Sequence, residues 1–123
     1  MKGKAAHLII IVSILFIGSL QANSQVKKTC LGRWDFEAPS APQGYNFGVI
    51  EIKNDSINTI FSGTTYKFPS VWVRITNDSV TYKTVIDGTD VLFSLKVENA
   101  SNIGGNAVWS DGETRMILKK KTN

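Results

Sequence analysis

Apolar and polar residues alternate in short runs from Gly32 to the C-terminal end, and most runs end in residues that favour turns. A period of two is typical of strands with one buried face. Asn, Asp, Ser and Gly at the connections suit tight hairpins, and no stretch after residue 24 has a helical period of useful length. The pattern predicts eight strands, at residues 32–37, 45–54, 57–63, 65–76, 79–87, 90–98, 102–109 and 113–120.

The alternation slips by one residue at two places, near Gly48 and across Pro69 and Ser70. A glycine bulge explains the first slip, and a proline that cannot donate to a ladder explains the second. Two bends in long strands help a sheet to curl closed. We therefore expect an all-β fold, a single antiparallel up-and-down β-barrel of about eight strands, with a β-sandwich as the alternative. The side chains expected to point inward are Trp34, Phe36, Ile50, Ile52, Val73, Ile75, Tyr82, Ile86, Phe93, Leu95 and Val97.

A nearly unbroken apolar run from Leu8 to Leu20 follows Lys2 and Lys4 and ends at the small residues of segment 22–24. A basic start, an apolar run of this length and a small-residue cleavage site predict a secretory signal peptide at residues 1–24. An uncleaved membrane anchor is the alternative, but the run is short for a membrane span. We then expect an extension at 25–31, the barrel at 32–120 and a tail at 121–123. The protein would be periplasmic or secreted, with no membrane span after cleavage.

Removal of the signal peptide changes the charge balance. It leaves 99 of the 123 residues, and without Lys2 and Lys4 the 14 basic residues become 12 against 10 acidic ones, a net charge of +2. Five of those lysines lie near the ends of the mature chain, so its body carries no basic surface with interleaved aromatics. The sequence therefore argues against a nucleic-acid partner and favours a small monomeric domain.

Histidine and cysteine restrict the possible chemistry. The single histidine, His7, lies in the predicted signal peptide, so the mature chain has none for a Ser-His-Asp site or a histidine metal centre. Cys30 is the single cysteine and cannot close an intramolecular disulfide, although an intermolecular one remains open. We expect no cofactor, no metal site and a stability that depends on the packed core.

The segment Gly32-Arg33-Trp34 opens the first strand with a Gly-x-Trp sequence that resembles the lipocalin signature. The wider pattern is similar to the small lipocalin-like modules of secreted bacterial proteins. It adds Phe36, Ala41-Pro42, Tyr45-x-x-Gly48-x-Ile50-x-Ile52, Gly63 and Lys119-Lys120-Lys121. The resemblance implies that Trp34 closes one end of the barrel beneath a basic side chain of the last strand, for which Arg115 and Lys119 are the candidates. It implies no particular ligand, because such modules are often appended to exported hydrolases.

Exposed aromatic residues are the best binding candidates. Trp72 and Arg74 have the parity opposite to the aliphatic residues beside them, so we expect them on the outer face unless a loop or the barrel rim covers Trp72. With Tyr66 or Trp109 nearby, they would suit stacking on a sugar or docking of a partner. Barrel strands of this length favour an interior filled by side chains over a spacious calyx.

Two further patterns carry weaker hypotheses. Asp35 and Glu37 share one strand face and imitate a paired-acid site, although a glycosidase needs its carboxylates facing each other across the substrate. Asp-Ser-aliphatic occurs at Ser56 and Ser79, each within a turn sequence that structure alone can explain. It looks like the acceptor motif for O-glycosylation in some Gram-negative anaerobes.

These observations favour an exported, non-enzymatic binding module that holds a small ligand, glycan or partner protein at the barrel rim or outer face. One alternative is a lipocalin-type carrier of a small apolar molecule in an internal pocket. The second alternative is a hydrolase or isomerase that depends on carboxylates alone.

Overall fold

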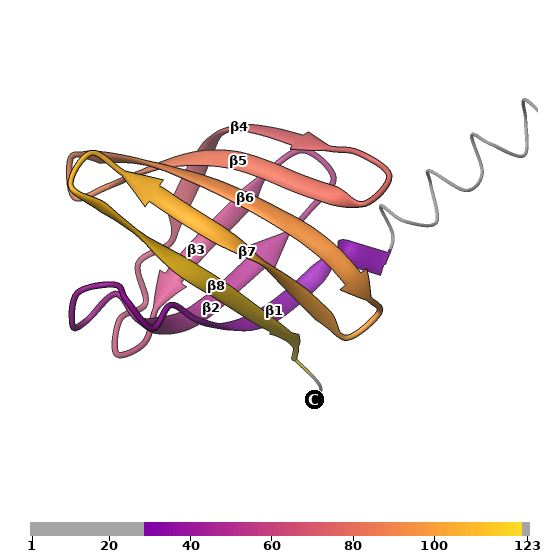
Figure 1. The fold of residues 1–123 in the computed structure, drawn as a ribbon, viewed down its shortest axis with the longest axis horizontal. Coiled ribbons are helices and arrows are strands. Elements are labelled where there is room, and N and C mark those ends of the chain that lie inside the picture. Colours follow the sequence, from indigo (N-terminus) through magenta and orange to yellow (C-terminus); the bar gives the residue numbers. More distant parts are fainter. Residues whose placement is uncertain (1–28, 122–123) are drawn as a thin grey trace, which may run out of the picture.

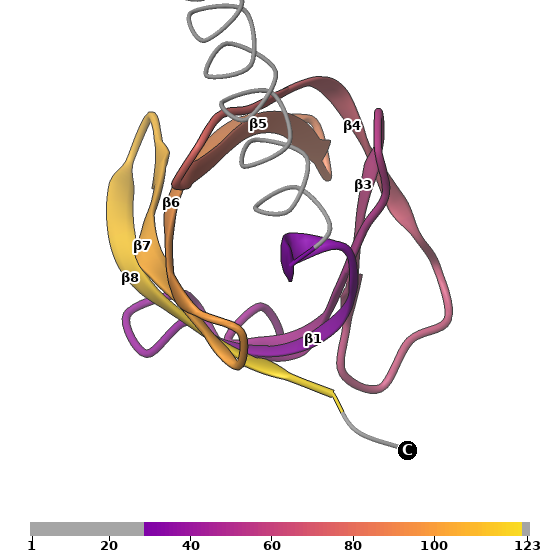
Figure 2. The same ribbon diagram turned by 90° about the vertical axis from the view of Figure 1, so that its right-hand side faces the viewer.

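The computed structural model describes residues 29–121, whose eight strands join in sequence order into a closed antiparallel barrel (Figures 1 and 2). The strands are β1 (Gly32–Glu37), β2 (Phe47–Ile52), β3 (Ile57–Phe61), β4 (Phe68–Ile75), β5 (Ser79–Ile86), β6 (Thr89–Asn99), β7 (Asn102–Trp109) and β8 (Gly112–Lys120). The predicted signal peptide, most of the predicted extension and the last two residues lie outside the described part of the chain.

The barrel is closed by pairing of its first and last strands. β1 and β8 pair from Trp34 opposite Lys120 to Glu37 opposite Ile117, and every other strand pairs with its neighbours in sequence. The barrel prediction is confirmed, and the β-sandwich alternative is wrong. No helix within residues 29–121 is long and apolar enough to cross a membrane.

Side chains alternate between the barrel interior and the solvent. Of the eleven predicted inward residues, Val73, Ile75 and Val97 are half-buried and pack against the core, and the other eight are buried. Tyr82 stacks on Phe93 with ring centroids 4.4 Å apart and planes at 6°. The core prediction is therefore confirmed.

The two predicted bulges have different outcomes. The register of β4 against β5 shifts between Ser70 and Trp72, so the irregularity after Pro69 is confirmed. Through Gly48, in contrast, β2 pairs with β1 and β3 in continuous register, so the predicted bulge there is wrong. The parity changes because β2 begins only at Phe47 and Tyr45 belongs to the preceding loop.

One end of the barrel is covered by the turn at residues 29–31 (Figure 2). The indole Nε1 of Trp34 donates a hydrogen bond of 2.9 Å to the carbonyl oxygen of the buried Cys30. The Lys120 ammonium lies 4.8 Å from the centroid of the Trp34 ring and donates to the Leu31 carbonyl oxygen. We call this the closed end.

The basic residue at the closed end differs from the two candidates named from the sequence. Met116 and Leu118 point inward on β8, and Lys120 continues their parity. Arg115 and Lys119 have the opposite parity and lie exposed on the outer face. Lys120 therefore takes the place that was expected for Arg115 or Lys119.

Candidate functional site

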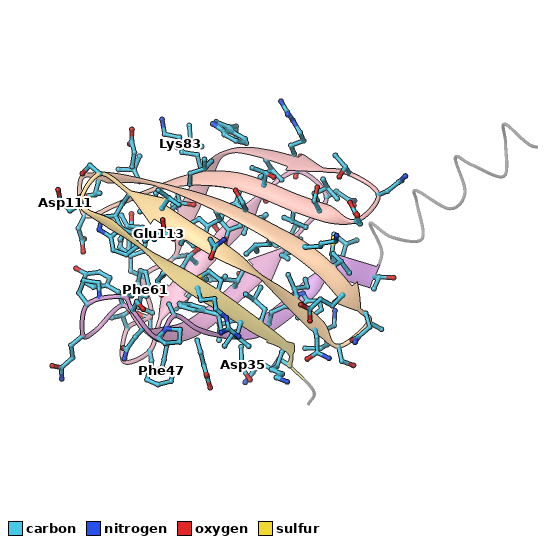
Figure 3. All side chains as sticks on the ribbon, viewed as in Figure 1. Asp35, Phe47, Phe61, Lys83, Asp111 and Glu113 are labelled. Atoms are coloured by element: carbon cyan, nitrogen blue, oxygen red, sulfur yellow. The ribbon has the colours of Figure 1, made fainter. Side chains whose placement is uncertain are left out.

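The opposite end of the barrel, the open end, contains a cavity of about 320 Å³. The loop at 38–46, the inner sides of several strands and the start of the β5–β6 turn line it. Most of its larger wall residues are apolar: Phe36, Phe61, Ile86, Phe93, Trp109 and Met116. Figure 3 shows Phe61 among the side chains at this end, with Asp111 at the tip of the β7–β8 turn. The expectation of a filled interior is therefore wrong for this end.

Small inward residues explain the space. Along β7, the inward positions pass from the buried Ile103 at the closed end to Ala107, which lines the cavity. Ala38, just after β1, lines it as well. The cavity is about twice the volume of an engineered cavity of about 150 Å³ that holds benzene. It thus has room for a molecule of about ten non-hydrogen atoms.

Asp87 is the single charged residue among those that line the cavity. It lies at the rim, on the exposed β5–β6 turn, and accepts a hydrogen bond of 2.5 Å from the hydroxyl of Tyr45. This bond joins the loop at 38–46 to the β5–β6 turn. The Asp87 carboxylate raises the pKa of Tyr45, because its hydrogen bond to the neutral phenol and its negative charge both oppose ionisation.

Thr114 contributes a second polar group to the cavity wall, and its hydroxyl is already bonded. Its Oγ1 accepts from the backbone N–H of Ser40 at 2.9 Å and donates to the Arg115 carbonyl at 3.1 Å. Thr114 therefore fixes the loop at 38–46 over the open end.

Three buried hydroxyls form no hydrogen bond of normal geometry within the described part of the chain: those of Thr59, Tyr82 and Thr84. All three residues are fully buried. Thr59 also lines the cavity, from the centre of β3. Burial raises the pKa of Tyr82 far above its usual range, and hydrogen bonding with the nearby Thr59 hydroxyl opposes this shift to a smaller extent. The polar groups of the mainly apolar wall are therefore those of Tyr45, Asp87, Thr89 and Thr114, together with the Thr59 hydroxyl at its inner surface.

A second hollow, of about 750 Å³, lies beside the cavity at the rim. It shares Tyr45, Phe61 and Asp87 with the cavity and adds residues of the β3–β4 loop, among them Tyr66. Tyr66 is 61% exposed, and its ring lies edge-on to Phe68 with centroids 4.6 Å apart. The rim thus presents aromatic side chains around the cavity mouth.

The four predicted ligand-binding residues fall in two places. Tyr66 lies at the rim, and Trp109 is a half-buried part of the cavity wall whose ring packs over Gly112. Trp72, which is 42% exposed, and Arg74 lie on the outer face of β4. Parity predicted this exposure of Trp72, but the four residues do not form one site.

The remaining candidates lie away from the cavity. Asp35 and Glu37 are exposed on the outer face of β1, and Figure 3 labels Asp35 there. Asp35 pairs with Lys121 at 3.6 Å. Ser56 and Ser79 lie half-buried beside turns, and Ser79 Oγ is 2.5 Å from Thr76 Oγ1. No group of three or more His, Cys, Asp or Glu residues within 29–121 could hold a metal ion.

Sequence reasoning missed Tyr45, Thr59 and Asp87. Thr59 carried a usable signal, because it is a polar residue at an inward position between Ile57 and Phe61. Tyr45 and Asp87 carried none, since a loop and a turn that are 42 residues apart meet only in the folded barrel.

No protein-family model and no curated protein sequence matches the chain. Among solved structures, a redesigned β-barrel is similar, with a TM-score of 0.53 and 12% sequence identity. The alignment covers 79% of this chain and 96% of the redesigned barrel. At this identity the likeness shows the fold alone.

Proposed function

We propose that the chain is an exported, non-enzymatic binding protein that holds a small, mainly apolar molecule in the cavity at the open end. The observation that carries this proposal is an apolar cavity of about 320 Å³ inside a closed barrel. Ligand sites of proteins are typically concave, largely apolar and provided with a few polar groups. The proposal of export rests on the apolar run from Leu8 to Leu20.

The position of the aromatic residues favours this cavity over the outer face. Trp109 forms part of its wall and Tyr66 part of its rim, whereas Trp72 and Arg74 lie on the outside of β4. The non-enzymatic part of the proposal rests on a mature chain without histidine and on the outward position of Asp35 and Glu37. For about ten buried ligand atoms we expect a Kd of about 10 μM.

Calorimetric titration with naphthalene or 2-naphthol, which have about ten non-hydrogen atoms, tests the proposal. In the Ala107→Phe variant the new ring occupies the cavity, so we expect binding to weaken at least about tenfold. Val108→Phe places the same ring on the outer face at the adjacent position, where Val108 is 45% exposed, and should leave binding unchanged. Trp72→Ala should also leave it unchanged.

Two results would contradict the proposal. One is a wild-type protein that takes up neither compound up to its solubility limit. The other is a folded Ala107→Phe variant that binds as tightly as the wild type. Loss of binding in Trp72→Ala alone would instead assign the site to the outer face.

A further inference from the structure

We infer that the ligand of the cavity is an uncharged molecule with one hydroxyl or carbonyl group, and that this group hydrogen-bonds to the hydroxyl of Thr59. The inference rests on the proposed function, and it adds the chemical class of the ligand and the residue that orients it.

Thr59 is the polar anchor because it is buried, lines the cavity and makes no hydrogen bond of normal geometry to the rest of the described chain. Its exposed fraction is 0%, and its Oγ1 has no hydrogen-bond partner among residues 29–121. A buried hydroxyl without a partner costs free energy, and a ligand that pairs with it recovers that cost. A threonine hydroxyl both donates and accepts, so a carbonyl and a hydroxyl both fit.

The neighbourhood of Thr59 supports a neutral partner. Among the other hydroxyls on the cavity wall, that of Thr114 already bonds to Ser40 and Arg115, and that of Tyr45 bonds to Asp87. The remaining one belongs to Thr89, which is half-buried beside the β5–β6 turn. The buried hydroxyl of Tyr82 lies close to that of Thr59, whose hydrogen bonding opposes the rise in the pKa of Tyr82. The neutral hydroxyl of Thr59 can satisfy one polar group of a ligand, but it cannot balance a buried full charge.

The charges of the cavity argue against an anion. No lysine or arginine is among the residues that line it, and the carboxylate of Asp87 lies at its rim. A carboxylate or phosphate ligand would lose its hydration without gaining a cationic partner. A cation would find only Asp87, whose carboxylate already accepts the bond from Tyr45.

Three probes with one carbon skeleton test the inference: naphthalene, 2-naphthol and 2-naphthoate, titrated calorimetrically at pH 7. One net hydrogen bond to a buried hydroxyl corresponds to an affinity gain of about tenfold. We therefore expect 2-naphthol to bind about tenfold tighter than naphthalene, and 2-naphthoate to bind at least about tenfold more weakly than 2-naphthol.

Three variants assign the preference to a residue. Thr59→Val removes the hydroxyl and keeps the shape, so the ratio between 2-naphthol and naphthalene should fall to about one. Thr59→Ser keeps the hydroxyl and should keep most of the preference. Thr84→Val removes another buried hydroxyl, one that does not line the cavity, and should leave the ratio unchanged.

The outcomes separate the two proposals. If no probe binds, the proposed function fails and this inference fails with it. If naphthalene and 2-naphthol bind equally to the wild type, or the preference persists in folded Thr59→Val, the inference is overturned while the binding function stands. Preferential binding of 2-naphthoate would overturn the inference as well.

Discussion

The buried hydroxyls of Thr59, Tyr82 and Thr84 are unfavourable groups in the barrel core. Each has been taken out of water without a hydrogen-bond partner in the described chain. The penalty for such a group is about 1–3 kcal/mol. An apolar residue of the same shape would therefore give the ligand-free barrel a higher stability. Substitutions at these positions can thus distinguish a group that stabilises the barrel from one that binds a ligand.

Tyr82→Phe is expected to stabilise the ligand-free protein by about 1 kcal/mol, because it removes the desolvated hydroxyl and keeps the stacked contact with Phe93. The free energy of unfolding from urea titration measures this change. A loss of about 1 kcal/mol or more would mean that the hydroxyl is satisfied in solution, for example by a bound water.

Single residues were predictable where parity alone determines their position. The inward position of Tyr82 followed from alternation along its strand, as did the exposure of Trp72. Lys120 was missed because the parity of the last strand was ambiguous around Ile117, which left Arg115 and Lys119 as the candidates. The Tyr45–Asp87 bond was not predictable, since it depends on where a loop and a turn meet.

At the scale of elements, all eight predicted strands are present, and the discrepancies lie at their ends. The prediction started β2 too early, because aromatic Tyr45 and Phe47 imitate a strand face. The structure gives Gly48 a packing role instead of a bulge. A Cβ atom there would lie 2.6 Å from Cε2 of Phe36 and closer still to the backbone oxygen of Ile60. Strands β1, β2 and β3 can approach each other closely because Gly48 has no side chain.

Gly48→Ala is therefore expected to destabilise the barrel by about 3 kcal/mol, since the backbone of β3 cannot move aside easily. Gly63→Ala is the matched control. Gly63 has a φ of +88° and open space around its Cβ position, so the cost there should be about 1 kcal/mol, from backbone strain alone. Chemical denaturation compares the two variants, and an equal cost would contradict the packing role of Gly48.

At the scale of the whole molecule, the two ends of the barrel differ in how they are filled. Large residues such as Trp34, Ile103 and Leu118 fill the closed end, whereas Ala38 and Ala107 leave space at the other. Alternation predicts which side chains point inward, but not whether their summed volume fills the space between eight tilted strands. The fold could therefore be predicted from the sequence, and the cavity could not.

The buried Tyr82 also makes the stability of the whole barrel depend on alkaline pH. Burial raises the pKa of Tyr82 in the folded protein, whereas in the unfolded chain a tyrosine ionises near pH 10. Above about pH 10 the unfolded state therefore binds fewer protons than the folded state. The contribution of Tyr82 to the free energy of unfolding is thus complete below this pH and decreases as the pH rises. The decrease from one such group is up to about 1.4 kcal/mol per pH unit.

Urea titrations at several pH values between about 9 and 11 measure this slope. Tyr82→Phe should lose the part of the slope that comes from Tyr82, whereas Thr84→Val, which changes another buried hydroxyl without a titrating group, should keep the wild-type slope. Absorbance at a wavelength specific for tyrosinate gives a second readout, because Tyr82 should ionise only as the barrel unfolds. Reversible ionisation of Tyr82 in the folded barrel near pH 10 would contradict its burial. It would also contradict the close stacking of Tyr82 on Phe93, which lines the cavity.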